Sequence, residues 1–201
     1  MIPITAHDAL LVIDVQNDFL PGGALVVPRG DAVIPVINHL TRLPFGQQAA
    51  SQDWHPHGHA SFASTHGSHA PHGTWPDHCV AGTHGAELAP ALDQTRVGMV
   101  IRKGRALDID SYSAFLDNDR TTRTGLEFWL RGLGVTRVFI TGLALDYCVA
   151  FTAIDAKTLG FETFVVEDAC RGIAPDPAAT WQALERHGIV RVRSADLAGT
   201  A

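Results

Sequence analysis

Short apolar runs alternate along the chain with segments of helical periodicity, and this alternation constrains the fold more than any other feature. The apolar runs have the length of buried strands and cover residues 9–15, 97–102, 138–142, 161–166 and 189–192, and residues 47–52 form a further, weaker strand candidate. The helical patterns cover residues 31–43, 124–132, 146–159 and 176–187. Because the connections are too long for hairpins, successive strands are expected to run parallel. The sequence therefore predicts an α/β protein whose mostly parallel sheet is covered on both faces.

The chain is expected to form a single domain over residues 1–201, since it has neither an internal repeat nor a composition break typical of a linker. One region, about residues 54–95, shows little periodicity. Structureless segments of this length inside a domain are usually functional or disordered. Trp54, Phe62 and Trp75 argue against disorder, because disordered segments are poor in aromatic residues. We therefore expect this long loop to be ordered and to carry part of a functional site.

The charge and the apolar runs argue against several classes of partner, and the cysteine content indicates the compartment. The formal net charge is −6 and the basic residues are scattered, which argues against binding to nucleic acid or to an anionic membrane. No apolar run approaches membrane-spanning length, and no basic leader precedes the first one. The three cysteines, Cys79, Cys148 and Cys170, suit a reducing compartment better than a disulfide framework. A cytoplasmic protein is expected.

Reactive side chains follow four successive strands of the predicted sheet, namely Asp14, Asp53, Lys103 and Cys148. In open α/β sheets, ligand sites form beyond the carboxyl ends of the strands, so these four groups are expected to share one pocket. Each alone has a simpler structural interpretation, such as a packed thiol or a solvent-facing charge. Together, Asp14, Lys103 and Cys148 supply a base, a cation and a nucleophile, which are the ingredients of covalent thiol catalysis. A position in the first turn of a helix would favour the Cys148 thiolate.

The long loop is rich in histidine and offers a candidate metal site. Asp53 and His55 lie on one turn, and His78 comes from the far end of the loop. Carboxylate and imidazole ligands suit Zn²⁺, Fe²⁺ or Mn²⁺, and three protein ligands would leave positions for water or substrate. A solvated loop without a metal explains the same spacing, and the two interpretations stay open. Solvent exposure is the preferred interpretation for the remaining histidines, His57, His59, His66, His69, His72 and His84.

Several motifs, in order, resemble the nicotinamidases of the isochorismatase-like cysteine hydrolases. The first are Asp14-Val-Gln-Asn-Asp-Phe19 with Pro-Gly-Gly-Ala-Leu after it, Ser51-Gln-Asp-Trp-His55 and Trp75-Pro-Asp-His-Cys79. The others are Lys103-Gly, Asp110-Ser-Tyr-Ser-Ala-Phe115, Gly142-Leu-Ala-Leu-Asp-Tyr-Cys148 and Asp168-Ala-Cys-Arg-Gly172. The match runs from about residue 9 to residue 171. The resemblance implies a Rossmann-like three-layer α/β/α sandwich.

It also implies an activity, the hydrolysis of nicotinamide to nicotinate and ammonia in NAD salvage. The implied catalytic triad is Asp14, Lys103 and Cys148, and the implied ligands of one divalent metal ion, with zinc or iron favoured, are Asp53, His55 and His78. Phe19, Trp75 and Tyr112 match the aromatic positions around the pyridine ring. A cis peptide before Ala144 would aim the backbone N–H groups of Ala144 and Cys148 at the substrate carbonyl oxygen.

Two positions depart from the family pattern. Some relatives carry a further metal-binding histidine near Ser61, so here Ser61, His57, His59 or water would take that place. Leu145 stands where relatives often have threonine. A related cysteine hydrolase acting on another amide or on an N-carbamoyl compound is the closest alternative. A metal-binding protein without enzymatic activity is a further one, although it gives Asp14, Lys103 and Cys148 no reason to coexist.

Overall fold

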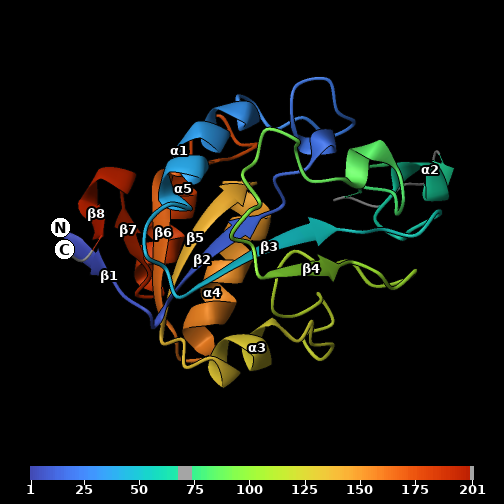
Figure 1. The fold of residues 1–201 in the computed structure, drawn as a ribbon. Coiled ribbons are helices and arrows are strands. Elements are labelled where there is room, and N and C mark those ends of the chain that lie inside the picture. The colour runs from blue at the N-terminus through green and yellow to red at the C-terminus, as the bar shows by residue number, and fades with distance from the viewer. Residues whose placement is uncertain (68–73, 200–201) are drawn as a thin grey trace.

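A six-stranded parallel sheet forms the centre of the computed structural model, which describes residues 1–67 and 74–199 (Figure 1). The strand order is β4-β3-β2-β5-β6-β7, and every neighbouring pair is parallel. The strands are β2 (Asp8–Ile13), β3 (Gln47–Asp53), β4 (Met99–Lys103), β5 (Arg137–Leu143), β6 (Glu162–Arg171) and β7 (Val190–Val192). The predicted α/β fold with a mostly parallel sheet is confirmed.

Helices cover both faces of the sheet, and Figure 1 shows α1 on one side and α3 and α4 on the other. The helix α1 (Val33–Leu40) contacts β5 and β6 and belongs to the same core cluster as Leu10 and Val12 of β2. The opposite face carries α3 (Leu126–Gly132), α4 (Ala150–Thr158) and α5 (Ala178–Arg186). Successive side chains of a strand point to opposite faces, so Leu11 and Ile13 join the second core. Burial on both faces explains why β2 is apolar throughout its centre.

The predicted elements differ from the observed ones mainly at their ends. β6 continues to Arg171, beyond the predicted end at residue 166, because its pairing with β5 resumes after an irregularity and joins Gly142 to Cys170. The predicted helix over 146–159 begins instead with a π-helical turn, η5 (Leu145–Val149), before α4. The strands β1 (Ile2–Ile4) and β8 (Leu197–Gly199) form a separate parallel pair that was not predicted, since three residues are too few to show a period.

The long loop extends past the carboxyl ends of the strands and is folded on itself. It contains the short helix α2 (Ala63–His66) beyond the ends of β3 and β4 (Figure 1), and isolated bridges join His55 to Val80 and Phe62 to Trp75. Phe62 is completely buried, which agrees with the expected order of this region. His69 and His72 lie outside the described residues. Within the described part of the chain, no helix is long and apolar enough to cross a membrane.

Phe139 is the most informative core position for stability, because its ring stacks on Phe164 at 4.5 Å between centroids and meets Phe45 edge-on. Phe139→Ala should lower the free energy of unfolding by about 3–5 kcal/mol, as measured by urea denaturation. Phe128 on α3 is 63% exposed and serves as the matched control. Its replacement by alanine should change stability by about 0.5 kcal/mol or less. Equal losses in the two variants would contradict the assignment of the core.

Candidate active site

The carboxyl ends of β2, β3, β4 and β5 bring the predicted reactive groups together. Asp14 follows β2, Asp53 ends β3, Lys103 ends β4 and Cys148 lies in η5 just after β5. The chain adds strands outward from β2 on one side and then crosses to β5 on the other, so β2 and β5 form the switch point at which α/β sheets place their ligand sites. All four side chains are buried. The convergence expected from the sequence is therefore observed.

Lys103 contacts the other three members of this cluster. Its Nζ lies 2.9 Å from Asp14 Oδ2 and 3.4 Å from Cys148 Sγ, and it also forms an ion pair with Asp53 Oδ1. A further hydrogen bond to the carbonyl oxygen of Ser111 measures 3.0 Å. A buried ammonium requires such partners, since an unpaired charge in a low-dielectric interior is costly. The lysine thus joins the candidate triad to the candidate metal site.

Burial governs the protonation of both reactive partners of Lys103. It raises the pKa of the Cys148 thiol well above its ordinary value, although the lysine charge opposes this shift. It also raises the pKa of the Asp14 carboxyl, again against the effect of Lys103. This shift runs opposite to the one that a helix dipole would favour, because desolvation is its largest cause in this buried turn. The sulfur therefore holds its proton and needs a base to accept it.

Asp14 is placed to be that base. Its Oδ1 accepts a 2.6 Å hydrogen bond from the Ser51 hydroxyl, which fixes the carboxylate. Among the described residues no N–H or O–H group donates a well-aligned hydrogen bond to Oδ2, although this oxygen faces Lys103. The ligand atoms of Asp14, Asp53 and Cys148 all lie within 4.8 Å of one another. Asp14 Oδ2 is thus free to accept the thiol proton.

The turn around Cys148 has the backbone that the resemblance implied. The Leu143–Ala144 peptide bond is cis. The N–H groups of Tyr147 and Val149 both donate to the carbonyl oxygen of Ala144, which closes the turn. Ala144 and Cys148 both line a cavity in front of the Cys148 sulfur. The role of their N–H groups as donors to a substrate oxygen stays a prediction.

Asp53, His55 and His78 form a site suited to a divalent metal. Asp53 Oδ2 lies 3.7 Å from Nε2 of His55 and 3.9 Å from Nε2 of His78. The Nδ1 atoms of the two histidines are bonded to the carbonyl oxygens of Gly104 at 2.9 Å and of Pro76 at 2.8 Å. A carbonyl can only accept, so each Nδ1 carries the hydrogen and each Nε2 is left with a lone pair for a cation. The donor set therefore fits zinc, iron or manganese.

The charge of Asp53 also suits a metal ligand. Burial by itself would raise the pKa of this carboxyl, but Lys103 and His55 outweigh burial and hold the pKa well below its usual range. Asp53 is therefore ionised and offers one oxygen to Lys103 and the other to the two histidines. The same carboxylate serves both halves of the site.

The candidates for a fourth ligand engage other groups. His59 Nδ1 and the Ser61 hydroxyl are 2.7 Å apart, and His59 Nε2 lies 3.2 Å from the carbonyl oxygen of Ile109. The His59 ring stacks on His55 at 4.2 Å, so this buried histidine supports a metal ligand. His57 and His84 are exposed, as expected for surplus histidines. The expectation of solvent exposure is wrong for His59.

The cavity in front of Cys148 is lined mainly by aromatic and aliphatic side chains. Phe19, Trp75 and Tyr112, the three predicted substrate contacts, all line it. Trp75 Nε1 lies 3.3 Å from the Tyr112 hydroxyl, and the Trp75 ring meets Tyr147 edge-on at 4.9 Å. The sequence analysis missed four lining residues, namely Leu25, Asp110, Tyr147 and Ile173. Tyr147 could have been found from its place beside Cys148 in the quoted motif.

Gln16 is a further residue that was missed. It is fully buried, and its side-chain amide pairs with both the N–H and the carbonyl of Asp53, each at 2.8 Å. The chain leaves the sheet at Asp14, where φ is +48°, so β2 no longer offers backbone partners at this level. The amide of Gln16 replaces those partners and fixes Asp53. An unsatisfied buried backbone group would otherwise be costly.

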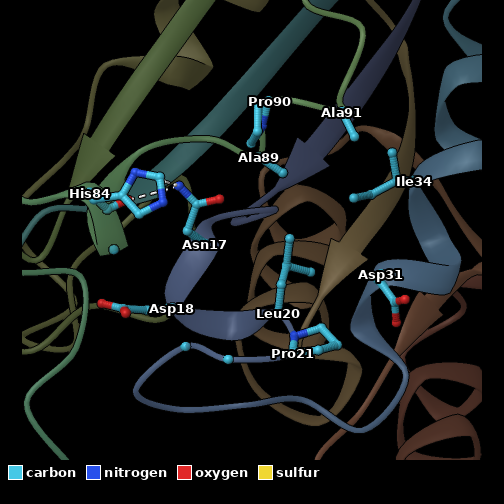
Figure 2. A pocket seen from close by; sticks show the side chains of 13 residues that line it. Asn17, Asp18, Leu20, Pro21, Asp31, Ile34, His84, Ala89, Pro90 and Ala91 are labelled. Atoms are coloured by element: carbon cyan, nitrogen blue, oxygen red, sulfur yellow. Dashed lines mark hydrogen bonds between the residues drawn. The ribbon is translucent and has the colours of Figure 1, made fainter.

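The next two residues of the same motif hold loops around the site. Figure 2 shows Asn17 and Asp18 beside a surface cleft, with the Asn17 side chain directed toward His84. Asn17 Nδ2 donates to the His84 carbonyl oxygen at 2.8 Å. Asp18 Oδ2 accepts from the N–H of Cys79 at 2.7 Å, next to His78. These contacts give Asn17 and Asp18 structural roles outside the reacting groups.

A buried Asp–Lys–Cys cluster at the switch point of a parallel sheet, with a carboxylate and two histidines beside it, defines a class of thiol hydrolase. The chain belongs to the isochorismatase family, whose model, described as an isochorismatase domain, matches residues 8–193. It is 45% identical over 201 residues to the nicotinamidase of Acinetobacter baylyi, covering 94% of each chain. It is also 45% identical to the nicotinamidase of Escherichia coli, covering 84% of this chain and 85% of that one. The resemblance drawn from the motifs is confirmed.

Two solved structures extend the comparison to the fold. PnC1 of L. infantum, crystallised in complex with nicotinate, is 41% identical with a TM-score of 0.91 and 99% of each chain covered. The pyrazinamidase of Pyrococcus horikoshii, crystallised in complex with zinc, is 39% identical with a TM-score of 0.79, covering 93% of this chain and 99% of that one. The three-layer architecture is shared throughout.

Gly104 provides a test of the metal site in which none of the candidate ligand residues is replaced. A Cβ on Gly104, where φ is +64°, would lie 2.4 Å from Cε1 of the His55 ring. Gly104→Ala should therefore displace His55 and weaken zinc binding by about tenfold or more, as measured by zinc titration of the metal-free protein. Gly125 is the matched control, because its φ is +99° but a Cβ there meets nothing within 4 Å. Equal affinities of the two alanine variants would remove His55 from the site.

Proposed function

We propose that this protein hydrolyses nicotinamide to nicotinate and ammonia through a thioester on Cys148. The observation that carries the proposal is the contact of Lys103 with Asp14, Asp53 and Cys148 in one buried cluster. This cluster opens on a cavity with aromatic walls, which suits a flat heteroaromatic amide. The curated relatives named above are nicotinamidases, and one structural relative holds nicotinate, the expected product.

The first half of the reaction forms the thioester. Asp14 accepts the Cys148 proton as the sulfur attacks the amide carbon, and Lys103 stabilises the negative charge that passes between them. The N–H groups of Ala144 and Cys148 would hold the developing oxyanion, at about 3 kcal/mol per donor. Asp14 then gives its proton to the amide nitrogen. The C–N bond breaks and ammonia leaves.

The second half uses the same groups in reverse. A water molecule gives a proton to Asp14 while its oxygen attacks the thioester carbon. The C–S bond breaks, the sulfur regains the proton from Asp14, and nicotinate is released. Lys103 stays charged throughout, because the charges of Asp14 and Asp53 outweigh burial, which alone would lower its pKa, and keep that pKa well above the usual value. Asp14 thus accepts and returns one proton in each half of the reaction, first the thiol proton and then a proton from water.

Orientation of the ring falls to the remaining residues. Asp53, His55 and His78 would hold one divalent cation, for which zinc or iron is favoured, and this Lewis acid would bind the pyridine nitrogen directly or through water. Phe19, Trp75 and Tyr112 would pack against the ring. The zinc-bound pyrazinamidase among the relatives supports zinc. Fixing the amide carbon over the sulfur supplies much of the rate, since it makes the attack intramolecular.

Pyrazinamide is a reasonable second substrate. The nicotinamidase/pyrazinamidase of Mycobacterium tuberculosis is 37% identical over 172 residues, covering 84% of this chain and 88% of that one. The second ring nitrogen changes the size of the substrate little. The other interpretations, an N-carbamoyl amidase or a metal-binding protein without activity, give no reason for an apolar aromatic cavity beside the metal site.

Ammonia release from nicotinamide is the direct test of this function. Cys148→Ala should abolish turnover, because no other buried group of the cluster can form the thioester, while bound nicotinate and zinc should persist. Cys170→Ala is the matched control, since Cys170 is equally buried but lies on β6 away from Lys103. This variant should retain activity. Turnover by Cys148→Ala would exclude the covalent mechanism, and its absence in the unmodified protein would exclude the substrate.

Lys103→Met tests the role of the buried ammonium group in the cluster. The variant leaves Asp14 and Asp53 as buried carboxylates without their cation, which should cost about 3–5 kcal/mol of stability and severely depress ammonia release. Lys157→Met on α4 is the control, because this lysine lies outside the cluster and should tolerate the change. Stability is measured by urea denaturation and activity in the ammonia assay. A mild effect on both would give Lys103 no catalytic role.

A further inference from the structure

The motif at residues 168–172 leads into a loop that is hydrogen-bonded to Asp146, a residue with no role in the proposed reaction. β6 ends at Arg171, and the next residues run past the nucleophile turn η5. The carboxylate of Asp146 accepts hydrogen bonds from the N–H of Ile173 at 2.9 Å and from the N–H of Ala174 at 2.7 Å. Bonds to an ionised acceptor are about twice as strong as neutral ones. One side chain of the nucleophile turn therefore holds this loop, residues 172–174, by two strong bonds.

Gly172 shows that the approach is close. A Cβ on this residue would lie 3.0 Å from Asp146 Oδ1 and 3.2 Å from Asp146 Cγ, which is tighter than nearly all real Cβ contacts. Glycine at this position thus lets the loop reach the carboxylate. The last residue of the quoted motif acquires a physical reason from this contact.

The loop held in this way supplies part of the substrate cavity. Ile173 lines the cavity together with Cys148 and Ala144, and it packs against the core that contains Phe19. Asp146 is two residues before Cys148 in the same turn. The two hydrogen bonds to Asp146 form a tether between η5 and the loop. This tether fixes the separation between the sulfur and one apolar wall of the cavity. Because the apolar walls of a cavity contribute to the binding of a substrate ring, this separation affects the affinity for the substrate.

The geometry points to Asp146 as a positioning residue that acts through Ile173 to orient the ring of the bound amide. This inference rests on the proposed function, because its kinetic readout uses that reaction. Asp146 touches neither substrate nor the reacting atoms. It determines where the wall formed by Ile173 stands relative to the nucleophile.

Asp146→Asn tests the tether, because an amide offers one accepting oxygen where the loop presents two N–H donors. We expect KM for nicotinamide to rise about tenfold or more while kcat changes less, since the triad is untouched. Nicotinate affinity, measured by calorimetry in the Cys148→Ala background, should fall in parallel. Asp168→Asn is the matched control, because Asp168 accepts from the backbone and the hydroxyl of Ser194 outside the cavity.

A double-mutant cycle with Ile173→Ala separates positioning from general damage. If Asp146 acts through Ile173, the double variant should have the KM of Ile173→Ala alone, whereas independent effects would multiply. Multiplied losses would overturn the proposal. So would a KM for Asp146→Asn within about twofold of that for Asp168→Asn. Should Asp146→Asn fail to fold, Gly172→Ala perturbs the same contact from the loop side and should raise KM in the same way.

Amide hydrogen exchange tests the tether independently of any substrate. The amides of Ile173 and Ala174 should exchange slowly in the unmodified protein and faster in Asp146→Asn, with no change in Asp168→Asn. Unchanged exchange would overturn the inference even if the enzyme is active. Faster exchange in a protein that releases no ammonia from nicotinamide would instead support the tether and refute the substrate.

Discussion

The burial of one ammonium between two carboxylates is the interaction on which the site depends. Lys103 contacts Asp14 and Asp53 and lies 3.4 Å from the Cys148 sulfur. In a region of low dielectric, each of these charges would be costly without the others, so the cluster forms as a unit. Desolvation keeps the proton on the sulfur, and the lysine keeps Asp53 ionised. The proposed thiol chemistry and the candidate metal site are therefore linked through a single side chain.

The parallel sheet makes this meeting possible. Residues 14, 53, 103 and 148 are far apart in the sequence, but parallel strands end at the same edge, and the change of direction at β2 leaves a space between the chains that follow β2 and β5. The centre of β2 is apolar on both faces, and the charged groups of the cluster lie at or just beyond the carboxyl ends of the strands. The long loop then covers these ends with His55, His78 and Trp75.

The sequence predicted the parts of this arrangement that depend on local periodicity. Six strands and four helices were placed, because their alternation and most of their apolar runs can be recognised without a structure. The strands β1 and β8 were not, because three residues show no period. Tertiary contacts were the other gap: the amide of Gln16 on the backbone of Asp53 and the stacking of His59 on His55 join residues whose proximity only the fold creates. The raised pKa of the Cys148 thiol has the same origin, since desolvation depends on the surrounding packing.

Irregular segments form much of the cavity, and buried or half-buried polar side chains give them the rigidity that regular structure would supply. Gln16 satisfies the backbone of Asp53, Asp18 satisfies the N–H of Cys79 beside His78, and Asp146 satisfies two N–H groups of the loop after β6. Each contact removes an orphaned backbone group, which is the main obstacle to placing a loop close to a core. Each also fixes a residue that touches either the cation site or the cavity. The same hydrogen bonds that make these loops stable therefore define the geometry in which the sulfur meets the amide.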